Sequence, residues 1–247
     1  MKFNVKFPLF FLTGFLLFSC ASTYMYGPGN LGHESRIFLT PLSSDSSQLQ
    51  HYVTGRYSLN AGQGYSQGES CNFGEASYHL GYSRKFISCG AGGMLFGGVY
   101  QVKKFEISPG WKNFYGFSAS GQVALNIPLG NYFNWRILGV RSGLAMEGGE
   151  LYNFRMRYRD YPGFNEYFDR QLMGHAGSFS EMMFQKNGYR LVLNNCNTIL
   201  FGKGRLQGFN SAVSAGFGYQ QYTLQYQYTA SSHGNTSQSL GLILRFF

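Results

Sequence analysis

A two-residue alternation of side-chain character runs through most of this chain and restricts its fold more than any other feature. In residues 115–127, apolar or aromatic positions alternate with small or polar ones. Residues 221–229 repeat the pattern without exception: Tyr222, Leu224, Tyr226 and Tyr228 alternate with Gln221, Thr223, Gln225, Gln227 and Thr229. Because successive side chains of a β-strand point to opposite faces, this alternation predicts two-faced strands.

The polar face of these strands carries Gly, Ser, Gln and Thr instead of the Lys and Glu expected on a sheet that faces water. Only 13% of the residues are charged, whereas about a quarter are charged in soluble domains. No apolar run beyond residue 20 reaches the length of about 20 residues that a membrane-spanning helix needs. We therefore predict an all-β chain whose strands form a closed barrel with a small, polar interior.

Ten strands are predicted between residues 50 and 247. Their predicted ranges are 50–59, 72–84, 87–100, 115–127, 132–148, 177–186, 189–203, 208–219, 221–229 and 238–247. Short turns, among them Asn187-Gly188, alternate with mostly longer loops, as in membrane barrels with short periplasmic turns and long external loops. A nine-strand count would leave the C-terminus outside, so we predict ten strands, with eight as the alternative. A phase slip near Gly139 predicts a β-bulge.

The first residues place two lysines before an apolar stretch, an order typical of a secretory signal. The segment from Leu17 to Cys20 (Leu-Phe-Ser-Cys) resembles a bacterial lipobox, in which the Cys is acylated and begins the mature chain. Phe18 departs from that pattern, which has a smaller residue there. The resemblance implies a signal peptide over residues 1–19 and a lipid, such as palmitate, on Cys20; cleavage after Ala21 is the alternative.

The segment that follows, residues 20–49, is rich in Gly, Pro and Ser, and we predict a periplasmic, lipid-anchored linker there. The barrel is predicted over residues 50–247. The remaining cysteines, Cys71, Cys89 and Cys196, are odd in number, so no disulfide framework is indicated.

The chain ends Leu-Gly-Leu-Ile-Leu-Arg-Phe-Phe, and a terminal strand finishing in Phe resembles the assembly signal of outer-membrane barrel proteins. The alternating apolar set stops at Phe246, one residue short of the terminal Phe247. The chain thus resembles the small outer-membrane β-barrel proteins of Gram-negative bacteria. The strand pattern carries this resemblance over residues 50–247, and the terminal motif carries it over the last ten residues. The resemblance implies an antiparallel up-and-down transmembrane barrel in the outer membrane, with membrane lipids and the barrel-assembly machinery as partners.

Four polar residues are predicted to share the barrel interior: Arg56, Glu75, Ser77 and His79. Some barrels of the resembled class are lipid A acyltransferases or deacylases, which use a His with Ser and a carboxylate. A narrow barrel also fills its interior with paired polar side chains, and we favour this polar-plug interpretation. No phosphate loop, nucleophile elbow or metal motif is present, so we predict neither an enzyme nor a cofactor.

The connection 149–176 combines aromatic and arginine side chains, which binding surfaces and membrane interfaces both use. We predict an external binding loop for an unknown ligand there, with a short helix at 164–173. The candidate residues are Tyr152, Arg155, Arg157, Arg159 and Tyr161.

The net charge of +9 comes from scattered residues with no dense basic cluster, which argues against nucleic acid as a partner. The function predicted from the sequence is a non-enzymatic structural, adhesive or minor transport role. Two alternatives remain open: a lipid A-modifying barrel enzyme, and a soluble periplasmic lipocalin-like barrel whose apolar faces would point inward.

Overall fold

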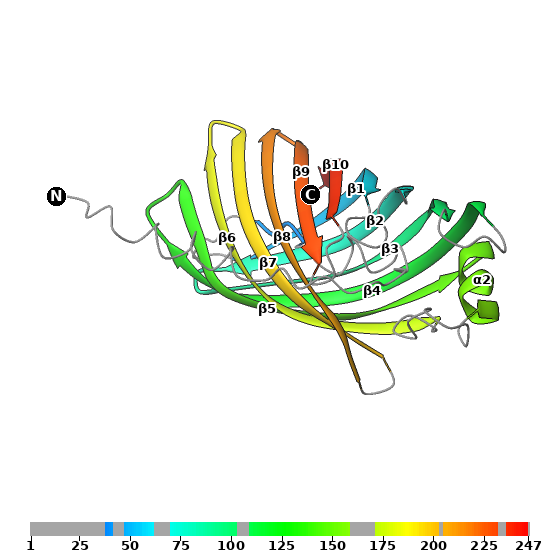
Figure 1. Ribbon diagram of the computed structural model, residues 1–247. Coiled ribbons are helices and arrows are strands. Elements are labelled where there is room, and N and C mark those ends of the chain that lie inside the picture. The colour runs from blue at the N-terminus through cyan, green and yellow to red at the C-terminus, as the bar shows by residue number, and fades with distance from the viewer. Residues whose placement is uncertain are drawn as a thin grey trace.

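The structure is a computed structural model that describes residues 38–41, 47–61, 70–102, 109–158, 171–202, 205–231 and 236–246. Ten antiparallel strands each pair with their neighbours in sequence, and β10 pairs with β1 to close a barrel (Figure 1). The strands are β1 Gln48–Ala61, β2 Ser70–Arg84, β3 Ile87–Val102, β4 Gly110–Pro128, β5 Phe133–Gly148, β6 Leu172–Lys186, β7 Tyr189–Gly202, β8 Arg205–Tyr219, β9 Tyr222–Ser231 and β10 Thr236–Phe246. The predicted ten-stranded up-and-down barrel is confirmed.

The connections β2–β3, β4–β5, β6–β7 and β8–β9, all short, lie at one end of the barrel, together with the start of β1 and the end of β10. We call this the turn end and the opposite one the loop end. At the turn end, Asn187 and Gly188 both have positive φ, 51° and 83°, as a two-residue hairpin turn that follows the strand twist requires. The β5–β6 register shifts between Arg136 and Gly139, which confirms the predicted bulge.

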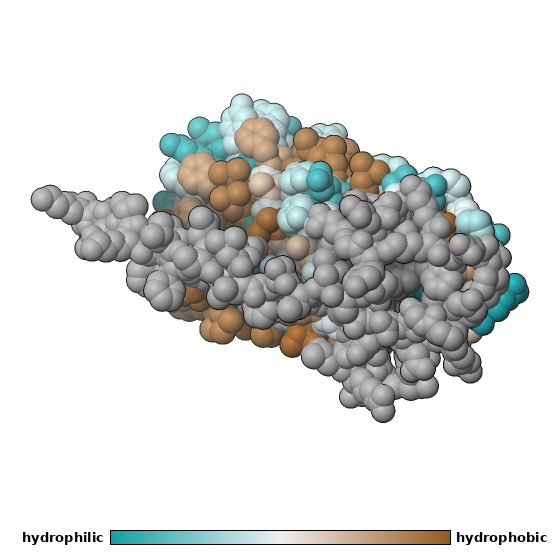
Figure 2. All heavy atoms as spheres, in the orientation of Figure 1, coloured by the Kyte–Doolittle hydropathy of each residue, from teal (hydrophilic) through white to brown (hydrophobic). Residues whose placement is uncertain are grey.

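The two faces of the strands separate by polarity. In β9, the outward-facing Tyr222, Leu224, Tyr226 and Tyr228 are 36–52% exposed. The residues that alternate with them, Thr223, Gln225, Gln227 and Thr229, are at most 3% exposed. Apolar side chains gather on the outer face of the barrel (Figure 2). A soluble lipocalin-like barrel would place its apolar faces inward. The observed orientation is the opposite one, and it is that of a barrel surrounded by lipid.

Closure of the barrel satisfies the backbone polar groups of every strand, which hydrocarbon demands because it offers them no water. A membrane span also requires an apolar surface toward the lipid, and the exterior of this barrel provides it. The chain is therefore an outer-membrane type of β-barrel, located in the outer membrane. Among the described residues, no helix has the length and hydropathy of a membrane span.

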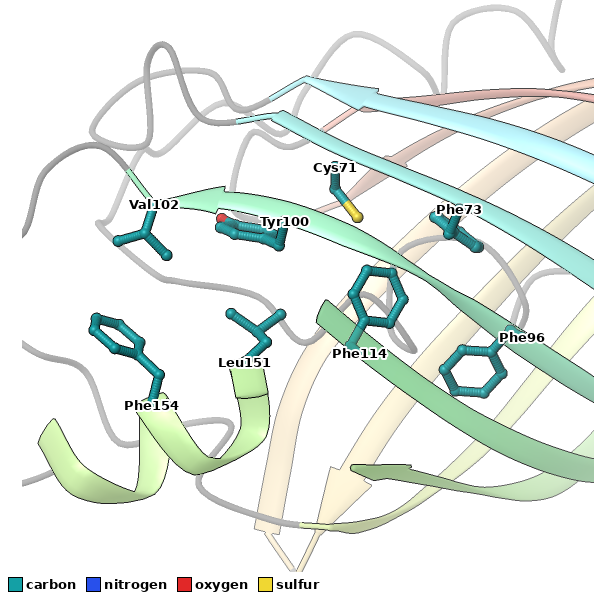
Figure 3. Packing of buried hydrophobic residues seen from close by; sticks show 8 residues of the cluster. All are labelled: Cys71, Phe73, Phe96, Tyr100, Val102, Phe114, Leu151 and Phe154. Atoms are coloured by element: carbon teal, nitrogen blue, oxygen red, sulfur yellow. The ribbon is translucent and has the colours of Figure 1, made fainter. Parts of the chain in front are cut away.

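One helix, α2 (Glu150–Tyr158), lies between β5 and β6 in the described part of the chain. It packs at the loop end, where Leu151 and Phe154 join side chains of β2, β3 and β4 in a buried apolar cluster (Figure 3). The cluster is completed by Cys71, Phe73, Phe96, Tyr100, Val102 and Phe114. No disulfide joins Cys71, Cys89 or Cys196 in the described part of the chain.

Candidate functional site

Inside the turn end lies an N-terminal segment, residues 38–41, that belongs to no strand or helix; we call it the N-terminal plug. Gln122 of β4 holds its first residue with a reciprocal pair of hydrogen bonds. The Phe38 N–H donates to Gln122 Oε1 at 2.7 Å, and Gln122 Nε2 donates to the Phe38 carbonyl at 2.7 Å. The amide side chain of Gln122 thus satisfies both backbone polar groups of Phe38, as a neighbouring strand would.

His79 of β2 binds the next residue of the plug. Its Nε2 donates to the Leu39 carbonyl at 3.2 Å. Its ring is stacked between Phe38 and Tyr52, with both pairs of ring centroids 4.7 Å apart. One ring nitrogen and one ring face of His79 therefore contact the plug, and the other ring face packs on Tyr52 of β1.

Arg136 of β5 binds the end of the plug. Its Nη2 lies 3.4 Å from the Thr40 carbonyl and 2.7 Å from the Pro41 carbonyl, and its Nε donates to Ser88 Oγ at 3.0 Å. It also forms an ion pair with Glu181 of β6, and both side chains are buried. All four plug carbonyls thus have a side-chain donor. A buried segment without regular structure requires such partners, because an unsatisfied buried carbonyl is costly.

At the loop end, Gly149 has a φ of +106°, a conformation that favours glycine, and it allows the chain to turn from β5 into α2. Asn113 of β4 secures the start of the helix. Its Oδ1 accepts the Glu150 N–H at 3.1 Å, while its own N–H donates to Glu150 Oε2 at 3.1 Å. The helix then directs Leu151 and Phe154 into the apolar cluster, and Arg155 forms a buried ion pair with Glu147 of β5.

Between these two ends, a polar network crosses the lumen. Arg56 donates through Nη1 to Gln227 Oε1 and through Nη2 to Gln225 Oε1, both at 2.8 Å. Gln225 Nε2 donates to Ser214 Oγ at 2.9 Å, and Ser214 donates to Asn194 Oδ1 at 2.7 Å. Strands β1, β9, β8 and β7 are therefore linked through their inward side chains.

The four residues of the predicted interior cluster all lie on the lumen face. Arg56 and Glu75 are opposite each other in the β1–β2 register, and Ser77 and His79 follow Glu75 at two-residue intervals. Their contacts, however, are not those of a catalytic triad. Nε2 of His79 is bound to the plug, and its Nδ1 is buried with no hydrogen-bond partner among the described residues. A histidine that activates a serine must hydrogen-bond to it.

The predicted external loop, residues 149–176, contains the helix α2, and its candidate residues differ in exposure. Arg157 is exposed and Tyr152 is half-buried, whereas Arg159 and Tyr161 lie outside the described residues. The expected external position of Arg155 is corrected, because its side chain is 1% exposed and pairs with Glu147. Of the helix expected at 164–173, residues 164–170 lie outside the described residues, and 172–173 begin β6.

Sequence reasoning missed Gln122, Arg136, Glu147 and Glu181, the residues that hold the two ends. The alternation of polar and apolar residues along their strands could show only that their side chains face inward. The spacing of Leu151, Phe154 and Arg155, which places them on one helical face, was a usable signal for a helix that packs on the barrel.

No protein-family model matches the chain, and no curated protein matches it. Among solved structures, the transport unit of the autotransporter AIDA-I from Escherichia coli is 12% identical, with 85% of this chain and 94% of that one covered and a TM-score of 0.40. The translocator domain of NalP from Neisseria meningitidis is 8% identical, with 87% and 90% covered and a TM-score of 0.39.

The outer-membrane expressed OmpT of Vibrio cholerae is 9% identical, with 72% of this chain covered and a TM-score of 0.34. This chain spans 61% of the length of that one. These similarities are too weak to indicate an activity.

Proposed function

We propose that this protein is a non-enzymatic outer-membrane barrel with a structural or adhesive role, and that its lumen is closed to diffusing solutes. The observation that carries the proposal is the burial of lumen-facing side chains along the strands. In an open pore, such side chains would face water. Here Thr223, Gln225, Gln227 and Thr229 of β9 are each at most 3% exposed.

The two ends of the lumen support the same proposal. The N-terminal plug is bound at the turn end by three strands, through Gln122, His79 and Arg136. At the loop end, α2 packs Leu151 and Phe154 against apolar side chains of the strands. Of the roles that the sequence left open, a structural or adhesive role fits a filled lumen better than transport does.

Conductance tests this proposal. We expect the purified protein in planar lipid bilayers to give no stable channel steps, because a filled lumen leaves no continuous water path. A variant that lacks residues 38–41 and carries Leu151→Asp and Phe154→Asp loosens both ends, and it should conduct. The matched control is Arg157→Asp, a charge change on the exposed face of α2, which should stay closed. Steady open-channel conductance of the wild-type protein would overturn the proposal.

We further propose that Cys20, which lies outside the described residues, is acylated and tethers the chain to the membrane, and that the terminal strand β10 is read by the barrel-assembly machinery. The lipobox-like segment and the terminal Phe residues support these two proposals. A Cys20→Ala variant should lose labelling by a clickable fatty acid and change its processing. Heat-modifiable gel migration should persist, because insertion depends on the strands. Labelling that survives in the variant, or that is absent from the wild-type protein, would contradict lipidation of Cys20.

A further inference from the structure

A group of uncharged polar side chains lies on the outer face of the barrel, across β6, β7 and β8, which are neighbouring strands (Figure 1). Its members are Ser178, Asn195, Asn197 and Ser211, and we call it the polar outer patch. Asn197 stands opposite Ser178 in the β6–β7 register and opposite Ser211 in the β7–β8 register. Cys196, between the two asparagines, points inward and is fully buried, so the asparagines point outward.

The patch lies at the depth of the hydrocarbon layer. On the outer face of β7, two apolar side chains precede the asparagines and two follow them, all 37–47% exposed: Leu191, Leu193, Ile199 and Phe201. The headgroup regions lie beyond such an apolar band. Comparable outward positions of β1, β4 and β10 hold apolar side chains, for example Val53, Phe117 and Leu242. Asparagine at this depth is therefore an exception on the surface of this barrel.

The polar atoms of the patch are not satisfied by the barrel itself. Two other outward serines of this region, Ser142 and Ser180, donate to backbone carbonyls at 3.1 and 3.2 Å. In the patch, Asn197 Nδ2 donates to Asn195 Oδ1 at 3.3 Å. This bond leaves the Asn195 amide nitrogen and the Asn197 amide oxygen without a partner among the described residues. Lipid chains offer no hydrogen bonds, so these groups favour a protein partner.

We propose that the polar outer patch is the interface of a homodimer in the membrane, in which the two copies pair their asparagines. An uncharged amide carries both a donor and an acceptor, so two identical patches complement each other. Both copies enter the membrane in the same orientation, and a twofold axis along the membrane normal brings equal depths together. The small side chains of Ala176, Ser178 and Ser211 allow close approach. The dimer uses the outer face alone, so it does not depend on whether the lumen conducts.

A cysteine placed in the patch tests the dimer. The parent is the full-length protein with Cys89→Ser, which removes an exposed native cysteine, in outer-membrane vesicles. With a mild oxidant, Ser178→Cys in this parent should form a disulfide-linked dimer, because a residue near a twofold axis meets its own copy. The matched control is Leu80→Cys, which is 36% exposed on β2, the strand opposite β7 in the barrel. It should give no more dimer than the parent. Equal dimer yields from the two positions, or a link from Ser178→Cys to a different protein, would overturn the proposal.

Removing the amides tests their role in the dimer. Asn195→Leu with Asn197→Leu should lower the dimer yield of Ser178→Cys about tenfold, because the hydrogen bonds between the copies are lost. Heat-modifiable migration should persist in this variant, since leucine suits the lipid face, and this separates loss of the dimer from loss of the fold. Val53→Leu, on the outer face of β1, is the control and should leave the dimer yield unchanged. A dimer yield that survives the two leucine substitutions would contradict pairing through the asparagines.

Discussion

Replacing Arg136 with methionine is expected to destabilise the barrel by about 3–5 kcal/mol, because it leaves a buried carboxylate without its counter-charge. Glu181 is 1% exposed and forms its ion pair with Arg136. The same change also removes the donor to the Thr40 and Pro41 carbonyls. The midpoint of heat-modifiable migration, measured at a fixed heating time, should fall by about 6–20 °C for a chain of this size.

The matched control removes both charges. In an Arg136→Met, Glu181→Met double variant, no carboxylate is left unpaired, and replacing a buried ion pair by apolar residues is often close to neutral. We expect the double variant to recover most of the lost stability, while the plug stays weakened because its carbonyls lack the arginine. If the double variant is as unstable as Arg136→Met alone, the buried pair is not the origin of the loss.

An arginine in place of Tyr226 should destabilise the inserted barrel by about 2–4 kcal/mol, because it places a charge on the lipid face near the middle of the membrane. Tyr226 is 45% exposed and lies in the middle of β9. The change should lower the midpoint of urea unfolding in lipid vesicles, together with the fraction that folds into them.

Tyr222 provides the control on the same face of the same strand. It is 49% exposed and stands at the turn end of β9, where an arginine can reach the headgroups and should cost only about 0–1 kcal/mol. A large difference between the two variants requires a hydrocarbon layer around the barrel. Equal effects of Tyr222→Arg and Tyr226→Arg would contradict the membrane orientation.

The candidate site was only partly predictable, and the residues of the interior cluster show why. Periodicity placed Arg56, Glu75, Ser77 and His79 on one face, and in the structure the four lie at inward-facing positions of β1 and β2. Their partners could not be predicted, because Gln225 and Gln227 lie 169 and 171 residues from Arg56. A local pattern shows which way a side chain points, but the residue that it meets depends on how distant strands are brought together.

The sequence by itself determined the number of strands, the face that each presents to lipid and the Asn187-Gly188 turn, since these depend on neighbours a few residues apart. Only the tertiary structure decided how the lumen is filled. The plug at residues 38–41 carries no periodic pattern, and its place depends on donors from β2, β4 and β5. The same holds for Arg155, whose burial follows from the packing of α2 beside Glu147. Contacts of this kind form only after the barrel closes, because closure first creates the buried interior in which unpaired carbonyls and charges must find partners.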